Sequence, residues 1–359
     1  MKIGIVNFHP SSNYGGTLQY YALQTVLERM GHNVELVNRR WGSYIEPRPS
    51  LRRRLITTIT PPRANIFESF RKKYLHISRF ITSNSDLLEY AKSQDAILAG
   101  SDQIWNVDCM DLMGGYYLLD WVPDGVRKLS YSASFGSDSY GSDQKKIEQT
   151  KKLLNRFDSV SVREKSGVEL CNSLFGIKAI QHIDPTLLLS IDDYRSLYAN
   201  CSDCKGDYIL SYFLDKTEEK NRFVKQLCQQ EGIKTIDNNP QANRLQRFLK
   251  STVYEQPSIQ QWLRNIFDAR MVVTDSFHGM VFSLLFNKPF ICIGNNKRGN
   301  ARFNSLCETL ALEDVIIPEE SLSVLLQKKE IKINIINYSA VNKQLDIQRE
   351  RSISYFERF

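Results

Sequence analysis

Short apolar runs, each followed at once by a polar turn, are the feature of this sequence that most limits its fold. Ile3–Asn7 is such a run, and the loop after it leads to apolar residues at helical spacing from Thr17 until Gly31. Val34–Val37 then starts the pattern again. Strand, helix and strand in this order are the opening of a parallel α/β sheet.

The same alternation continues along the chain. In the first half, further strands are expected at Ala96–Ala99, Leu129–Ala133 and Ser159–Val162. In the second half, strands are expected at Tyr208–Tyr212, Lys234–Asp237, Met271–Thr274 and Pro289–Ile293, with helices at Glu218–Glu231, Ser258–Ile266 and Gly279–Phe286. Val341–Phe359 has the pattern of a last helix.

A chain of 359 residues fits two domains of ordinary size. We place an N-terminal α/β domain at residues 1–190, a second α/β domain at 206–338 and a C-terminal helix at 339–359 that returns to the first domain. The predicted fold class is α/β, with two Rossmann-like domains that face a central cleft. By fold-level analogy this resembles the GT-B glycosyltransferase architecture.

Composition excludes several classes of protein. The chain has 47 Lys and Arg against 40 Asp and Glu, a net charge of +7, which is below a nucleic-acid signature. The N-terminus lacks the apolar stretch of a signal peptide, and no window approaches the roughly 20 apolar residues of a membrane span. Cys201 and Cys204 form the only close cysteine pair, and no second pair completes a zinc site. We expect a cytoplasmic protein with no metal and no cofactor.

A basic insertion occupies about residues 47–80. Within it, Pro47–Lys73 carries arginines and lysines on both sides of Pro61-Pro62. One interpretation is a flap that contacts the anionic inner face of a membrane, which makes the protein peripheral to it. The alternative is a solvated loop with ordinary surface charge.

Thr274–Gly279 carries the strongest functional signal. It links the apolar run Met271–Thr274 to an almost wholly apolar helix, so the N-terminus of that helix should present backbone N–H groups to a ligand. An anion bound there would meet Ser276, His278 and, through close approach at Gly279, the backbone. The alternative is a helix cap with a structural histidine.

Three further strand ends carry polar residues. Arg163, after Ser161-Val162, can bind a carboxylate or phosphate in bidentate fashion, or form a surface pair with Glu164. Arg298 and Arg302 follow the last strand with two more guanidinium groups. In Gly100–Asn106, the residues suited to a sugar are Ser101, Asp102, Gln103, Trp105 and Asn106, with Asp102 also a candidate general base; the alternative there is an Asx-type turn with Trp105 in the core.

The first loop contains Asn13-Tyr14-Gly15-Gly16, and it lacks the G-x-G-x-x-G of a dinucleotide site. Helix capping is its default interpretation. His9, in the same loop, is a weaker candidate for the cleft, and His182 is interpreted as structural.

Together these motifs resemble the polysaccharide pyruvyl transferase family. The resemblance rests on Asn13-Tyr14-Gly15-Gly16 with Leu18-Gln19, Gly100–Asn106, Ser161-Val162-Arg163-Glu164, Asp184-Pro185-Thr186 and Thr274–Gly279, in this order. It runs from residue 3 to about residue 315.

The resemblance implies transfer of a pyruvyl group from phosphoenolpyruvate to a pair of sugar hydroxyls, with release of phosphate. It implies that Arg163 binds the donor and that His278 is the active-site histidine. The donor side would also include Ser276, Gly279, Arg298 and Arg302, and the acceptor side Asn13, Tyr14, Gly15 and the Gly100–Asn106 loop. Many family members carry Arg where this chain has Ser276, and we expect Arg298 or Arg302 to replace it.

Two rival functions stay open. One is a GT-B glycosyltransferase that uses a nucleotide sugar, and the other is a non-catalytic subunit of an envelope polysaccharide pathway. For the acceptor we favour a lipid-linked oligosaccharide, since the basic insertion would meet an anionic membrane.

Overall fold

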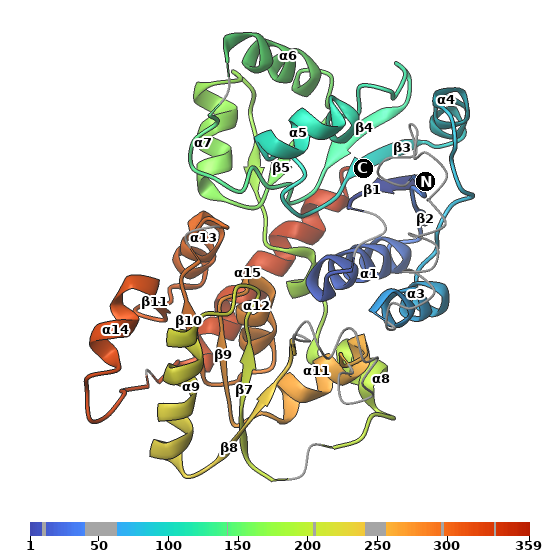
Figure 1. Ribbon diagram of the computed structural model, residues 1–359. Helices are drawn as coiled ribbons and strands as arrows, with labels where there is room; N and C mark the ends of the chain where they lie inside the picture. Colours follow the sequence, from blue (N-terminus) through green and yellow to red (C-terminus); the bar gives the residue numbers. More distant parts are fainter. Residues whose placement is uncertain are drawn as a thin grey trace, which may run out of the picture. The chain divides into compact units, whose positions relative to one another are not determined.

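The computed structural model describes residues 1–8, 12–39, 63–141, 143–203, 206–240, 256–295, 298–333 and 335–359, and the side chains of 63–65 are outside the description. In chain order the first elements are β1 (Lys2–Val6), α1 (Tyr14–Arg29), β2 (Asn33–Leu36), α3 (Arg63–Tyr74), α4 (Asn84–Lys92), β3 (Ala96–Ala99), α5 (Val107–Met113), β4 (Arg127–Ser130), α6 (Gln144–Leu154), β5 (Ser161–Val162), α7 (Lys165–Ser173) and β6 (Ile180–Gln181) (Figure 1).

The later elements are α8 (Ile191–Tyr198), β7 (Tyr208–Tyr212), α9 (Glu218–Glu231), β8 (Lys234–Asp237), α11 (Ile259–Asp268), β9 (Met271–Thr274), α12 (Phe277–Leu285), β10 (Phe290–Ile293), α13 (Ala301–Leu310), β11 (Ile316–Ile317), α14 (Leu322–Leu325) and α15 (Tyr338–Phe356). The chain divides into two compact units: Met1–Arg54, Glu68–Leu188 and Ile347–Phe359 form the first, and Leu55–Phe67 and Leu189–Asp346 form the second. The helix α15 therefore begins in the second unit and ends in the first.

The first unit contains a four-stranded parallel sheet in the order β2-β1-β3-β4. Asn13 caps α1 by accepting a hydrogen bond from the Gly16 amide at 3.1 Å, which is why the helix starts earlier than the predicted Thr17. The strand expected at Leu129–Ala133 ends at Ser130, and beyond it Ala133 makes only isolated bridges to Asp102 and Val162. This bridging joins the loop after β3 to β5.

The second unit contains a five-stranded parallel sheet in the order β11-β10-β9-β7-β8. Side chains alternate between its faces, as the strand period requires. Ile209 and Val273 pack on one face with Phe223 of α9. On the other face, Tyr212 makes an edge-to-face contact with Trp262 of α11. The parallel strands place the loops after β7, β9 and β10 at one edge of the sheet, where polar residues gather.

Candidate active site

The turn after β9 is held to the neighbouring strand by Thr274. Its Oγ1 donates to the Tyr212 carbonyl at 2.7 Å and accepts from the Ser276 amide at 3.0 Å. A Cβ added to Gly279 would lie 2.2 Å from the same Oγ1. The absence of a side chain at Gly279 thus lets α12 pack against Thr274, a reason that lies in the fold and was not visible in the sequence.

Ser276 is the N-cap of α12. Its side chain accepts from the Gly279 amide at 3.4 Å, and every residue of the helix is buried. His278 lies in the first turn and is 6% exposed, with its ring centroid 5.4 Å from that of Phe277. The expected geometry, a histidine beside the N-terminus of a buried helix, is present. The cap predicted as the alternative is present too, so the two interpretations describe one structure.

Asp275 in the same turn belongs to a charged group with Lys220 and Glu319, of which only Glu319 is partly exposed. The Lys220 ammonium lies 2.9 Å from an Asp275 carboxylate oxygen and 3.0 Å from one of Glu319, and the side chains of Lys220 and Asp275 are fully buried. Burial lowers the pKa of Lys220, but hydrogen bonds and attraction from the two carboxylates outweigh it and hold that pKa above its usual range. The ammonium therefore stays charged inside the protein.

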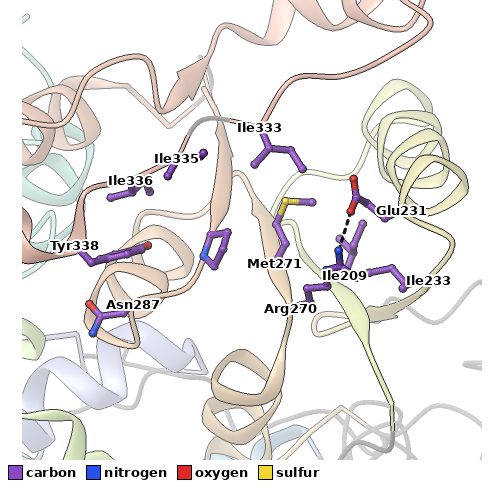
Figure 2. A pocket seen from close by; sticks show the side chains of 11 residues that line it. Ile209, Glu231, Ile233, Arg270, Met271, Asn287, Ile333, Ile335, Ile336 and Tyr338 are labelled. Atoms are coloured by element: carbon purple, nitrogen blue, oxygen red, sulfur yellow. Dashed lines mark hydrogen bonds and ion pairs between the residues drawn. The ribbon is translucent and has the colours of Figure 1, made fainter.

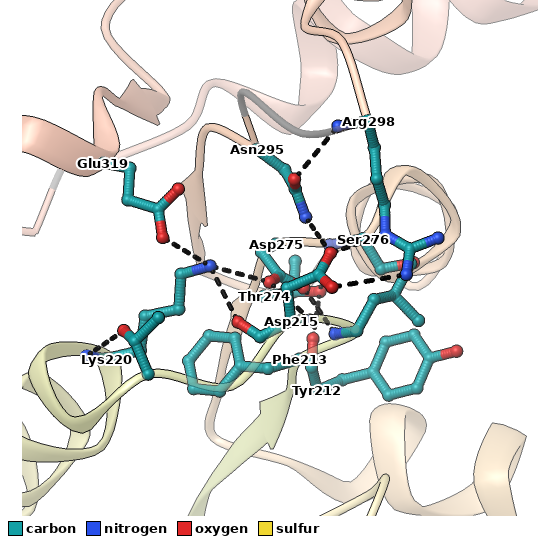
Figure 3. Close-up of polar contacts among 12 residues, drawn as sticks. Tyr212, Phe213, Asp215, Lys220, Thr274, Asp275, Ser276, Asn295, Arg298 and Glu319 are labelled. Carbon is teal, nitrogen blue, oxygen red and sulfur yellow. Dashed lines mark hydrogen bonds and ion pairs between the residues drawn. The ribbon is translucent and has the colours of Figure 1, made fainter.

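The same Asp275 carboxylate fixes the loop after β7. It accepts hydrogen bonds from the amides of Leu214 at 2.6 Å and Asp215 at 3.1 Å, and Lys220 also donates to the Asp215 carbonyl at 2.9 Å. With these partners, the Asp275 carboxylate serves to hold the surrounding loops together (Figure 3). Asp275 therefore joins the ends of β7 and β9.

Asp215 in turn holds a guanidinium group. Arg298 donates through Nε at 2.6 Å and Nη2 at 3.4 Å to the Asp215 carboxylate, which also accepts from Asn295 Nδ2 at 2.8 Å (Figure 3). The hydrogen bonds from Arg298 and Asn295 hold the pKa of Asp215 below its usual range, even though burial opposes them. The side chain of Arg298 remains 46% exposed.

Arg302, the other predicted donor ligand, has a different environment. It is buried, its Nη2 donates to the Arg298 carbonyl at 3.1 Å, and its guanidinium carbon lies 5.7 Å from the centre of the Phe277 ring. Ser276, His278, Gly279, Arg298 and Arg302 thus come together at one edge of the second unit's sheet.

In the first unit, Asp184 is the centre of the polar cluster. It accepts hydrogen bonds from Gln19 Nε2 at 2.6 Å, from Arg163 Nη1 at 2.9 Å and from the amide and hydroxyl of Thr186 at 3.0 and 2.6 Å. Ser101 joins through Gln19 at 3.0 Å. The motif residues that were far apart in the sequence therefore meet around one buried carboxylate.

Arg163 is 5% exposed and lies between two carboxylates, since Glu164 is 3.9 Å away. Burial lowers its pKa, but Glu164 and Asp184 raise it further, so the net pKa is above its usual range. The surface Arg–Glu pair considered from the sequence is wrong, because both side chains are buried. In this structure the Arg163 charge is balanced by Glu164 and Asp184.

The loop after β3 has a strained backbone at Asp102, whose φ is 99°. The Asp102 carboxylate accepts from the Gln103 amide at 2.8 Å, and Asn106 caps α5. Trp105 is 1% exposed in the core and donates from its indole to the Tyr117 carbonyl, so the sugar-stacking role predicted for it is wrong. Asp102, Gln103 and Asn106 are only half-buried.

The first loop places Asn13 at the surface and Tyr14 and Gly15 in buried positions at the start of α1. His9 lies outside the described residues, as do residues 47–62 of the basic insertion at 47–80. Cys204 lies outside them too, so the close cysteine pair is not described. Among described residues there is no cluster of metal ligands, and no helix has the length and hydropathy to span a bilayer.

His182 is structural, as its position suggested. Ser161 Oγ lies 2.8 Å from its Nδ1, and the rings of Tyr131 and Tyr355 lie against the imidazole. Burial, followed by repulsion from Arg351, lowers its pKa to about 4.

His182 should make the folded protein less stable in acid. Its folded pKa lies below the value near 6.5 of an unfolded imidazole, so the unfolded chain takes up the proton first. The contribution of the neutral His182 imidazole to the free energy of unfolding is fully present above pH ~6.5. It is lost as the pH drops towards 4, by about 2 kcal/mol at pH 5. Urea unfolding at pH 7 and pH 5 should show this loss in the wild type and a smaller one in His182→Gln. An equal loss in both proteins would contradict the assignment.

A cavity of about 340 Å³ lies at the opposite edge of the second sheet, beside the start of β7 and β9 (Figure 2). It is lined largely by apolar side chains, including Ile209, Met271 and Ile333, with the Arg270–Glu231 pair at one side. None of the predicted site residues lines it. Parallel α/β sheets bind ligands at the carboxyl ends of strands, so we assign the candidate site to the Thr274–Gly279 edge.

Four residues of the second-unit cluster were missed: Asp215, Lys220, Asn295 and Glu319. Asp215 and Asn295 follow the ends of β7 and β10, which is the same signal that identified His278. If every polar residue that follows a strand is taken as a candidate, both are predicted. Lys220 and Glu319 have no such signal, because one lies on a helix and the other follows a short strand.

Comparison with known proteins identifies a family for this chain. A family model described as Polysaccharide pyruvyl transferase matches residues 13–297. No curated protein sequence matches the chain.

Solved structures match over nearly the whole chain. The S. aureus MnaA–UDP co-structure is 13% identical, with 98% of this chain and 90% of that chain covered and a TM-score of 0.50. UDP-GlcNAc 2-epimerase from Neisseria meningitidis bound to UDP-GlcNAc is 10% identical, with 99% and 100% covered and a TM-score of 0.50. At these identities the matches show the fold alone, and they confirm the predicted α/β class of the GT-B type, with parallel sheets.

Proposed function

Since the chain belongs to the polysaccharide pyruvyl transferase family, we propose that it transfers a pyruvyl group from phosphoenolpyruvate to two hydroxyls of one sugar, with release of phosphate. The observation that carries this proposal is the cluster at the Thr274–Gly279 edge. There a histidine, a helix N-terminus and two guanidinium groups come together, and a donor with a carboxylate and a phosphate requires such groups.

The bond changes balance without a cofactor. The methylene carbon of phosphoenolpyruvate gains a proton and becomes a methyl group, which leaves the adjacent carbon electron-poor. One sugar hydroxyl adds to that carbon, the bond to the phosphate oxygen breaks, and a second hydroxyl closes the ketal. Of the two hydroxyl protons, one balances the proton taken up by carbon and the other leaves with phosphate.

We assign His278 to proton transfer, because imidazole can give and take a proton near neutral pH. Ser276 and the first-turn amides of α12 would bind donor oxygens, with Arg298 and Arg302 supplying positive charge. In the first unit, Asp102 is proposed as the base for the acceptor hydroxyl and Arg163 as a further donor ligand. Asn13, Ser101, Gln103 and Asn106 would contact the sugar.

The proposed acceptor is a lipid-linked oligosaccharide, and we propose a cytoplasmic enzyme that contacts the inner face of the membrane through residues 47–80. Support for this contact is the concentration of Arg and Lys in Pro47–Lys73. Neutralising Arg52, Arg53 and Arg54 should then reduce binding to anionic vesicles in a sedimentation assay. Unchanged binding would contradict the membrane contact and leave the pyruvyl transfer standing.

The proposal is tested by incubating the protein with phosphoenolpyruvate and candidate galactosyl or mannosyl acceptors. Phosphate release together with a product heavier by one pyruvyl ketal is the expected result. Turnover of a nucleotide sugar with none of phosphoenolpyruvate would instead support the glycosyltransferase alternative. Turnover of neither donor would support a non-catalytic subunit.

A further inference from the structure

We infer that Asp215 is a positioning residue, which holds Arg298 ready to bind the anionic groups of the donor. This inference rests on the proposed function and adds a residue to it. The contacts that carry it lie in three loops of the second unit, after β7, β9 and β10.

The three loops meet because their strands are parallel neighbours. Tyr212 of β7 pairs with Thr274 of β9, and Thr274 pairs with Cys292 of β10. The chain therefore leaves all three strands at the same level of the sheet. Asp215 lies in the first loop, Ser276 in the second and Arg298 in the third.

The backbone of Asp215 is itself held in place by Asp275 and Lys220. Its amide donates to Asp275 at 3.1 Å and its carbonyl accepts from Lys220 at 2.9 Å. Lys220 and Asp275 are fully buried, so these anchors have little freedom to move. The carboxylate of Asp215 thus projects from a backbone that two buried charges fix.

Arg298 and Arg302 differ in their access to a ligand. Arg302 is buried over Phe277, whereas the Arg298 side chain is 46% exposed. Asp215 contacts Arg298 through Nε and Nη2, one edge of a planar group that carries five N–H donors. Arg298 is therefore the arginine of this pair that an incoming anion reaches. Asp215 fixes the plane of the Arg298 guanidinium group.

The ion pairs of the cluster assign Asp215 to Arg298. Lys220 pairs with Asp275 and Glu319, whereas Arg298 pairs with Asp215. A donor carboxylate or phosphate would be a second anion on the Arg298 guanidinium. A guanidinium already held in place loses less conformational entropy when it binds.

The test is a double-mutant cycle with Asp215→Asn, Arg298→Ala and the combined variant. Calorimetry without acceptor measures the affinity for phosphoenolpyruvate, with inorganic phosphate as a second probe. We expect Arg298→Ala to weaken phosphoenolpyruvate binding roughly tenfold or more, and Asp215→Asn to weaken it several-fold. The combined variant should bind no more weakly than Arg298→Ala, since Asp215 acts through Arg298.

Steady-state assays add a readout that a purely structural role would not produce. Asp215→Asn should raise KM for phosphoenolpyruvate more than it lowers kcat. Glu231→Gln is the matched control, because it breaks the 3.2 Å Arg270–Glu231 pair at the opposite edge of the same sheet and should leave binding unchanged. Melting temperatures verify that each variant is folded.

The outcomes separate this inference from the proposed function. Wild-type binding of phosphoenolpyruvate with unchanged affinity in Asp215→Asn, or with losses that add in the combined variant, would overturn the positioning role and leave the function intact. No binding of phosphoenolpyruvate by the wild type would overturn the proposed function, and the positioning role with it.

Discussion

Replacing His278 with alanine should lower the rate of phosphate release from phosphoenolpyruvate by about 10²–10⁴-fold, the usual contribution of a positioned acid or base. The imidazole lies in the first turn of α12, beside the cap formed by Ser276. No other histidine is close to it in the sequence, so no second imidazole in this turn could take its role.

The measurement is the initial rate with saturating phosphoenolpyruvate and acceptor. His278→Asn, which keeps a polar side chain in the buried position, separates loss of proton transfer from loss of packing and should be nearly as slow. His32→Ala is the control, because this histidine lies beside the N-terminal amine at the amino end of β2 and should retain the wild-type rate. Full activity in both His278 variants would rule out the assigned role.

Replacing Lys220 with methionine should destabilise the protein by about 3–5 kcal/mol. The change leaves the Asp275 carboxylate fully buried without its ammonium partner, and a buried charge that loses its counter-ion is costly. The loss should appear as a lower urea midpoint, measured by the fluorescence of the four tryptophans, of which Trp262 lies in the second unit.

Two companions sharpen this experiment. Adding Asp275→Asn to Lys220→Met should recover part of the loss, because the amide removes the uncompensated charge. Arg195→Gln breaks the exposed pair with Asp192 at 2.5 Å and should cost no more than about 1 kcal/mol. A Lys220→Met variant as stable as Arg195→Gln would contradict the role assigned to the ion pairs of Lys220 with Asp275 and Glu319.

Three of the five strands of the second unit were predictable from the sequence with their bounds. Tyr208–Tyr212, Lys234–Asp237 and Met271–Thr274 were predicted with the bounds that the structure gives. Helix starts were less predictable, because a cap decides them. Asn13 moves the start of α1 to Tyr14, and Ser276 starts α12 at Phe277, two residues before the expected Gly279.

The motifs of the candidate site were predictable from the sequence, but the contacts between their side chains were not. The sequence indicates His278 and Arg298, because polar residues follow apolar strands. It does not show that Asp215, 83 positions before Arg298, binds it, since long-range pairing depends on the strand order. Trp105 was misassigned for a related reason: a sugar-binding tryptophan and a core tryptophan look alike until the burial is known.

A solvent-isotope experiment decides whether phosphoenolpyruvate supplies a ketal-linked pyruvyl group. The reaction is run in deuterium oxide with phosphoenolpyruvate and acceptor, and the product is analysed by mass spectrometry. We expect one pyruvyl ketal per acceptor, whose methyl group carries a single deuterium from the solvent. A product that retains the methylene group, or an acceptor that gains a sugar in place of pyruvate, would contradict the proposed transfer.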